Sequence, residues 1–371
     1  MILYLALLLC VIAAGYLFQV NDSPKRRGIY LACVGVVLIL FAALRAESVG
    51  ADTPQFASAY RQIVSKTWAE VLEMNYEKGF LVLCKLLSYL SSSPQLLIAF
   101  TAVLSIGSVC ILVYFHSPDA VLSMTLFIGL QYFANYMNLM RQVVAMSLVF
   151  LACEFLLRRF RFGWIPYLAV VALASFFHIS ALLLAVLCIF WYLPPRYLTV
   201  GIIGGASLFG IFFFSPLVRL AVRIIPKYAG YLESEYMVHG GLASALNLVI
   251  ALAVFALAAY LLFREGRFRS PLREGEDHRR AFFFWCAFAA LILAAFSLRA
   301  IIFDRLVFYF SVFLIVTVPL ALDALPRKAR IYAKCAICVW AVAFCAVVLA
   351  LRPEWTKVIP YKFFWAASVA A

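Results

Sequence analysis

The sequence predicts an all-α polytopic membrane protein with about twelve transmembrane helices, and two observations carry that prediction. Of the 371 residues, 67% are hydrophobic and only 13% are charged, whereas a soluble domain has about half apolar and a quarter charged residues. The apolar runs are continuous and lack the alternation of a membrane β-barrel. Because a backbone in lipid must satisfy its own polar groups, these runs are expected to be helices. We expect a single integral membrane domain over residues 1–371.

The formal net charge of +14 does not indicate a nucleic-acid partner. The basic residues are scattered between apolar runs, and no segment between them is long enough to fold alone as a binding domain. Acidic lipid surfaces and anionic lipid-linked substrates are better partners for such charges. The ten cysteines lie mostly within apolar runs and without zinc-finger context. We therefore expect buried thiols, with no metal site, disulfide or cofactor.

Twelve apolar runs are expected to be the spans, and they cover residues 1–20, 28–44, 96–115, 120–136, 139–157, 163–177, 179–193, 198–214, 246–263, 281–298, 306–322 and 332–351. Residues 80–91 are apolar but only about half the length that a span needs, so we expect a half-helix or an interfacial segment there. Basic loops mark the cytoplasmic face, above all residues 264–280. Residues 45–93 and 215–245 then form long outer loops, and both termini lie outside.

Two polar steps within the apolar runs are the first candidates for a site. Arg141 and Gln142 open a helix directly after a polar, aromatic turn, and His178 and Ser180 lie at an outer hairpin. A charge at such a place costs a few kcal/mol in a bilayer and usually serves a site or a partner. The plain alternatives are a boundary anchor for the arginine and a structural hydrogen bond for the histidine.

Carboxylates and arginines of the outer face are the next candidates. Asp52 and Glu77 lie in the first outer loop, where each is either a base or a solvated charge. Seven arginines are expected on a face that is normally depleted of them. Snorkelling and pairing with carboxylates would explain part of the set, and binding of a phosphate-rich substrate would explain the rest. The seven are Arg45, Arg61, Arg141, Arg219, Arg223, Arg299 and Arg305.

Several catalytic signatures are missing from the sequence. It has no P-loop, HExxH helix, GxSxG elbow or DxD-type pair for a nucleotide sugar. These absences argue against an ATP-driven pump and against a cytosolic nucleotide-sugar enzyme.

The order of short motifs resembles the EpsG family of Wzy-type polysaccharide repeat-unit polymerases. The motifs are Leu44-Arg45, Gly50-Ala51-Asp52 with Tyr60, Asn75 to Phe80, Asn138 to Ala145, Phe177 to Leu182, and Asp304 to Phe310. Family members often have an acidic-Pro-Gly-Phe step where this chain has Glu77-Lys78-Gly79-Phe80. The resemblance extends from Arg45 to about Leu322.

The resemblance implies an enzyme of the bacterial inner membrane, with a fold similar to the GT-C membrane glycosyltransferases. It would join oligosaccharides carried on undecaprenyl diphosphate, with its active site facing the periplasm. Donor and acceptor would both be lipid-linked oligosaccharides, and membrane lipids and a chain-length-regulating co-polymerase would be further partners. The departing diphosphate needs fixed cations, a role that arginines would fill without a metal.

The hypothesis gives each candidate residue a role. Arg141 and Arg305, with Arg299 and Arg45, would hold the diphosphate, while His178 or Asp52 would assist the acceptor hydroxyl. Catalysis is thus assigned to His178, Asp52 and Arg141. Substrate contacts are assigned to Arg45, Tyr60, Glu77, Asn138, Gln142, Ser180, Arg219, Arg223, Tyr228, Tyr231, Arg299, Asp304, Arg305 and Tyr309.

Two other classes of function stay open at this stage. A flippase or exporter of lipid-linked oligosaccharides would also need cations, although it would place them in mid-membrane and often shows an internal repeat. An O-antigen ligase or a membrane acyltransferase is closer, because it too pairs histidine or arginine with a lipid-linked donor.

Overall fold

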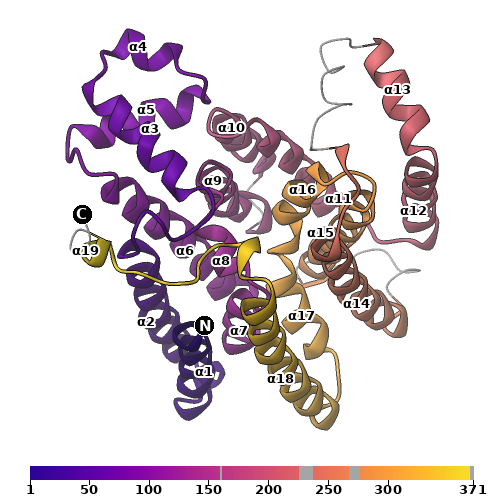
Figure 1. The fold of residues 1–371 in the computed structure, drawn as a ribbon. Coiled ribbons are helices and arrows are strands. Elements are labelled where there is room, and N and C mark those ends of the chain that lie inside the picture. Colours follow the sequence, from indigo (N-terminus) through magenta and orange to yellow (C-terminus); the bar gives the residue numbers. More distant parts are fainter. Residues whose placement is uncertain (159–160, 225–236, 267–275, 368–371) are drawn as a thin grey trace. The chain divides into compact units, whose positions relative to one another are not determined.

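The computed structural model describes residues 1–158, 161–224, 237–266 and 276–367, and nearly all of its regular structure is helical (Figure 1). The all-α prediction is confirmed for these residues, whose single β-bridge, between Arg45 and Phe363, is isolated. The helices form two compact units, residues 1–185 with 325–371 and residues 186–324. The expectation of one domain over the whole chain stays a prediction.

The first unit contains the N-terminal helices and, near the C-terminus, the long helix α18 with two short helical segments after it. Its helices are α1 (Ile2–Leu17), η1 (Val20–Asp22), α2 (Pro24–Ala43), α3 (Thr53–Ser65), α4 (Trp68–Glu73), α5 (Lys78–Ser88), α6 (Gln95–His116), α7 (Ala120–Gly129), α8 (Tyr132–Tyr136), α9 (Met140–Leu157), α10 (Trp164–Ser175), η2 (Ile179–Val186), α18 (Arg327–Leu351), η5 (Pro353–Trp355) and α19 (Phe364–Ala367). Helix α6 packs against both α2 and α9, and α9 packs against α10.

The second unit is built from helices that follow one another along the chain. They are α11 (Leu187–Tyr192), α12 (Tyr197–Phe212), α13 (Phe214–Ile224), α14 (Leu242–Arg264), α15 (Glu276–Ser297), α16 (Ile302–Ser311) and α17 (Leu314–Asp323). Helix α15 is central, since it packs against α11, α14, α16 and α17. Its indole Trp285 donates to the carbonyl of Leu193 at 2.7 Å.

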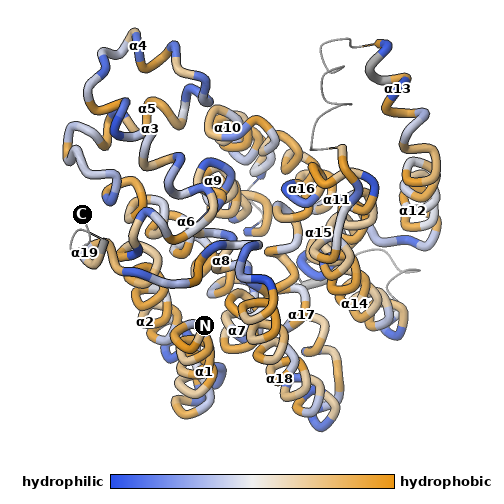
Figure 2. The backbone as a smooth tube through the Cα atoms, in the orientation of Figure 1, coloured by the Kyte–Doolittle hydropathy of each residue, from blue (hydrophilic) through white to orange (hydrophobic). Residues whose placement is uncertain are grey.

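The described residues contain six helices that are long and apolar enough to cross a membrane, namely α2, α6, α9, α14, residues His278–Ser297 of α15, and α18. Figure 2 shows their continuous apolar lengths. Two bent pairs raise the number to at most eight: α12 with α13, and α16 with α17. The chain is therefore a polytopic helical membrane protein, as its composition predicts.

Four of the twelve expected spans are apolar helices of 10–17 residues, below the usual spanning length. They are α1, α7, α10 and the segment Ile179–Tyr192. Residues 120–136 divide because Gln131 adopts a left-handed backbone with φ 64° between α7 and α8. Ile179–Tyr192 begins as a 3-10 helix and continues as α11. The count of twelve and the GT-C-like architecture stay predictions.

Helices α3, α4 and α5 form a small cap at one end of the first unit (Figure 1). The cap buries Phe56, Tyr60 and Phe80 in one apolar cluster that also contains Leu97 of α6 and Met140 of α9. The 11-residue helix α5 is too short to cross a bilayer, in keeping with the expected half-helix. Because one cluster joins the cap to two spans, the cap holds a fixed position at the start of α9.

The C-terminal segment after α18 returns to the start of the cap. Backbone hydrogen bonds join Ala46 to Lys362 and Phe364 to Leu44. The hydroxyl of Tyr361 donates to the carbonyl of Phe41 at 2.7 Å. The aromatic tail thus fastens the loop between α2 and α3, which carries two of the predicted site residues, Arg45 and Asp52.

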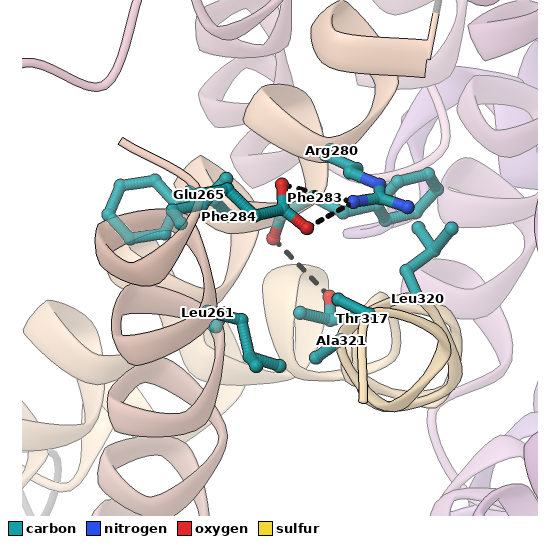
Figure 3. A pocket seen from close by; sticks show the side chains of 11 residues that line it. Leu261, Glu265, Arg280, Phe283, Phe284, Thr317, Leu320 and Ala321 are labelled. Atoms are coloured by element: carbon teal, nitrogen blue, oxygen red, sulfur yellow. Dashed lines mark hydrogen bonds and ion pairs between the residues drawn. The ribbon is translucent and has the colours of Figure 1, made fainter. Parts of the chain in front are cut away.

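A pocket in the second unit is lined by α14, α15 and α17 (Figure 3). Glu265 and Arg280 form an ion pair of 2.9 Å on one side of it. The hydroxyl of Thr317 bonds to the carbonyl of Phe283 at 3.3 Å. Apart from this ion pair and hydroxyl, the lining is aliphatic and aromatic, and the pocket holds none of the residues assigned to the site by sequence.

Candidate functional site

Glu77, Arg141 and His178, three residues selected from the sequence, meet in the first unit. A carboxylate oxygen of Glu77 pairs with Nη1 of Arg141. The other oxygen lies 3.0 Å from Nδ1 of His178. The three side chains are 20%, 24% and 18% exposed. Glu77 is therefore the centre of a half-buried cluster that a ligand can reach.

Three separate elements present these side chains. Glu77 is the residue before α5, Arg141 lies in the first turn of α9, and His178 follows α10 just before η2. The chain brings them together across 64 and 101 residues of sequence. Each lies at a helix end, so the cluster occurs where the cap meets the spans.

A close backbone contact fixes Glu77 beside His178. The N–H of Gly79 donates to the carbonyl of Phe176 at 2.8 Å. A Cβ on Gly79 would lie 2.8 Å from both the carbonyl carbon and the oxygen of Phe176. Only glycine fits this approach without a shift of the backbone, and the contact comes two residues after Glu77 and two before His178.

We therefore expect Gly79→Ala to push α5 away from the turn after α10. The overpacked contact should cost about 1–3 kcal/mol of stability and weaken the contact between Glu77 and His178, because Glu77 moves with the helix. Thermal unfolding would be measured on the purified protein. Gly107→Ala in α6 is the matched control, because a Cβ at this position meets open space. This change should raise the free energy of unfolding by about 0.5–1 kcal/mol. Equal unfolding midpoints of the two variants would contradict the proposed role of the contact between Gly79 and Phe176.

Aromatic rings hold the guanidinium of Arg141. It lies 5.4 Å from the ring centre of Phe56 and 5.3 Å from that of Tyr76. These rings also contact Phe80, at 5.4 Å and 5.9 Å. Among the described residues, Nε of Arg141 is buried without a hydrogen-bond partner. The arrangement leaves a positioned cation with unused donors, which suits an oxyanion.

The carboxyl of Glu77 is ionised at neutral pH. Burial raises its pKa, but hydrogen bonding from His178, backbone hydrogen bonding and the charge of Arg141 outweigh it and lower the pKa to about 2. A carboxylate with so low a pKa is a poor general base near neutral pH. Glu77 is a hydrogen-bond acceptor, so it favours the tautomer of His178 in which Nδ1 carries the hydrogen and donates the hydrogen bond. In that tautomer Nε2 is a hydrogen-bond acceptor.

The lowered pKa of Glu77 predicts a pH-dependent stability. A depressed folded-state pKa stabilises the protein above the unfolded value of about 4.5, and that contribution is lost as the pH falls toward about 2. With allowance for solvent screening, it amounts to about 1–3 kcal/mol. The difference in unfolding midpoint between wild type and Glu77→Gln should be constant from neutral pH to about 4.5 and shrink below it. A difference that persists at the acid end would contradict this role.

Asn138 and Arg45 hold the turn that precedes α9. The amide of Asn138 accepts from the backbone N–H of Ala51 at 2.6 Å and donates to the carbonyl of Thr356 at 2.9 Å. Arg45 is 2% exposed and donates to the carbonyls of Ala42 and, at 2.8 Å, Met137. Both side chains thus position the start of α9, and their assignment to substrate stays a prediction.

The remaining predicted residues of the first unit lie around this turn and in the cap. Asp52 is half-buried directly before α3 and makes no capping bond. Tyr60 is buried, with its hydroxyl donating to the carbonyl of Ser91 at 2.7 Å. Gln142 is buried next to Arg141, and Ser180 is half-buried after His178. The roles of these four residues stay predictions.

The other predicted residues belong to the second unit or lie outside the described residues. Asp304 accepts from the hydroxyl of Ser244 at 2.6 Å and so ties α16 to α14. Tyr309 is fully buried, Arg299 is half-buried, and Arg305 is exposed. Arg219 and Arg223 are exposed on α13. Tyr228 and Tyr231 lie outside the described residues. Whether these residues act with Glu77 stays a prediction.

The sequence analysis missed the residues that position the cluster. Phe56 and Tyr76 flank Arg141, and Gly79 and Phe176 make the backbone contact. The Glu-Lys-Gly-Phe step is visible in the sequence, but the partner of its glycine is distant along the chain. Within the described ranges, no group of three or more His, Cys, Asp or Glu residues could hold a metal ion.

Comparison with known proteins shows which family the chain belongs to. No curated protein and no solved structure matches the chain. The model of the EpsG family matches residues 28–363 of the 371, a range that contains the whole Glu77–Arg141–His178 cluster. The chain therefore belongs to the EpsG family.

Proposed function

We propose that the protein is a membrane glycosyltransferase that polymerises oligosaccharide repeat units carried on undecaprenyl diphosphate. The product is a surface polysaccharide, namely an O-antigen, a capsule or an exopolysaccharide. The reaction takes place at the periplasmic face of a bacterial inner membrane. Membership of the EpsG family supports this class of reaction, and the Glu77–Arg141–His178 cluster is the observation that carries it.

The cluster matches the two chemical needs of the reaction. The bond between the anomeric carbon and the diphosphate oxygen breaks, and negative charge develops on the departing lipid diphosphate. Arg141 supplies a fixed cation for that charge, with donors left over after its bond to Glu77. Such preorganised charge is typically the largest contribution to the rate.

The acceptor sugar hydroxyl must lose a proton as its oxygen attacks the anomeric carbon. Nε2 of His178 accepts this proton, while Glu77 holds the ring through Nδ1 and stabilises the imidazolium that forms. This assignment keeps His178 and Arg141 in the catalytic roles expected from the sequence. It moves Glu77 from substrate contact to the orientation of both, and it gives Asp52 no part in proton transfer.

The experiment that tests the function is a gel ladder of surface polysaccharide from a strain that lacks the gene. Complementation with the wild-type gene should restore long chains, whereas the empty vector should leave a single repeat unit. Long chains on the free lipid carrier in the deletion strain, without transfer to their final acceptor, would instead identify a ligase. An unchanged ladder would remove the polymerase assignment.

A further inference from the structure

The second unit has a sharp elbow between α12 and α13, which bend by 81° around Phe213. The ring of Phe214 lies 6.2 Å from Phe296 of α15 and 6.0 Å from Phe303 of α16, and these two rings stack at 5.3 Å. Gly210 makes room for this contact, since a Cβ there would lie 2.9 Å from Phe296. The elbow is thus packed against two other helices and is a built feature of the fold.

Helix α12 has the surface of a lipid-facing helix. None of its residues is buried by the rest of the protein, and its exposed side chains include Leu198, Ile202 and Phe209. Together with the first turns of α13, helix α12 is long and apolar enough to cross a membrane. A helix that leaves such a span at nearly a right angle runs along the membrane surface.

The residues of α13 are divided between two faces. Leu217, Leu220 and Ile224 recur at helical spacing and are 40%, 53% and 71% exposed. Arg219 and Arg223 are four residues apart on a different face, and both are exposed. This division, with arginine on the polar side, is typical of helices that lie in the interface between lipid headgroups and acyl chains.

We propose that α13 is an interfacial helix that binds anionic glycerophospholipids. Its leucines and isoleucine rest on the acyl chains, and Arg219 and Arg223 reach the phosphate groups of the surrounding lipids. The cationic arginines complement the anionic headgroups, and the apolar face of α13 continues the exposed apolar surface of α12. The inference does not depend on the polymerase function, and it gives the two arginines a ligand other than the substrate.

The position of α13 can be tested on the full-length protein in vesicles of phosphatidylethanolamine and phosphatidylglycerol. The exposed Cys10, Cys33 and Cys335 are first replaced by serine. A spin label is then placed by Leu220→Cys or, as the matched control on the polar face, by Ser215→Cys. We expect oxygen to relax the label at 220 and a water-soluble nickel chelate to relax the label at 215.

The arginines are tested by their preference for an anionic lipid. A fluorophore at 220 should be quenched more by spin-labelled phosphatidylglycerol than by spin-labelled phosphatidylcholine. Each arginine should contribute about fivefold to that preference. In the double variant Arg219→Gln/Arg223→Gln, the two lipids should therefore quench the fluorophore to nearly the same extent. Arg196→Gln, at the other end of α12, should leave the preference intact.

Four results would overturn the proposal. Relaxation of the label at 220 by the nickel chelate would place α13 in water. Protection of 220 from both reagents would show that protein covers this face. A preference for phosphatidylglycerol that survives the double substitution would show that Arg219 and Arg223 do not bind headgroups. If a polyprenyl diphosphate, and no glycerophospholipid, competes with the spin-labelled phosphatidylglycerol, the two arginines bind the substrate instead.

Discussion

Replacing His178 by alanine is expected to lower the rate of polymerisation by about 10²–10⁴-fold, the usual contribution of a general base. The reason is geometric: Glu77 holds Nδ1 of His178 at 3.0 Å, which leaves Nε2 to accept the proton of the hydroxyl. Turnover would be measured with purified protein and a lipid-linked repeat unit. His239→Ala is the matched control, because His239 is exposed in the second unit.

A double-mutant cycle separates catalysis from structure. Glu77→Gln should lower turnover on its own by disturbing the tautomer of His178 and the pairing of Arg141. If the two residues act as one unit, Glu77→Gln should cost little more in the His178→Ala background. Additive losses would mean that Glu77 works only through Arg141. Full turnover in His178→Ala would remove the histidine from the mechanism.

The sequence predicts the membrane class and most helix starts, because both depend on local composition. The start of α9 at Met140, the turn at His178 and the non-spanning α5 all follow from short-range patterns. Breaks within apolar runs are harder to predict. The left-handed residue between α7 and α8 is Gln131 and not Gly129, which lies two residues before it, and the elbow before Phe214 depends on rings in other helices.

The site shows the same limit. Charged residues in apolar runs are visible in the sequence because burial of a charge is costly, and this is how Arg141 and His178 were found. The sequence assigns catalysis to Asp52 and substrate contact to Glu77, and it does not show which carboxylate of this polar loop pairs with Arg141 and His178. The choice depends on the contact of Gly79 with Phe176, 97 residues away in the chain, which only the folded structure reveals.

Arg141→Lys is expected to lower turnover by about 10²–10³-fold although the positive charge is kept. The guanidinium pairs with Glu77 through one nitrogen, lies over two rings and keeps further donors for a phosphate oxygen. An ammonium is a point charge without this fork, so it cannot serve the carboxylate, the rings and the phosphate together.

The kinetic constants distinguish a transition-state role of Arg141 from simple binding. Charge on the diphosphate grows as the bond to the anomeric carbon breaks, so the loss in Arg141→Lys should fall mainly on kcat rather than on KM. Arg61→Lys is the matched control: its ion pair with Glu47 lies on the exposed surface of the cap, and such a pair contributes little. A rise in KM with unchanged kcat would make Arg141 a binding residue for the ground-state substrate. Wild-type kinetics in Arg141→Lys would show that the site needs only a positive charge at this position, and the argument from the guanidinium fork would fail.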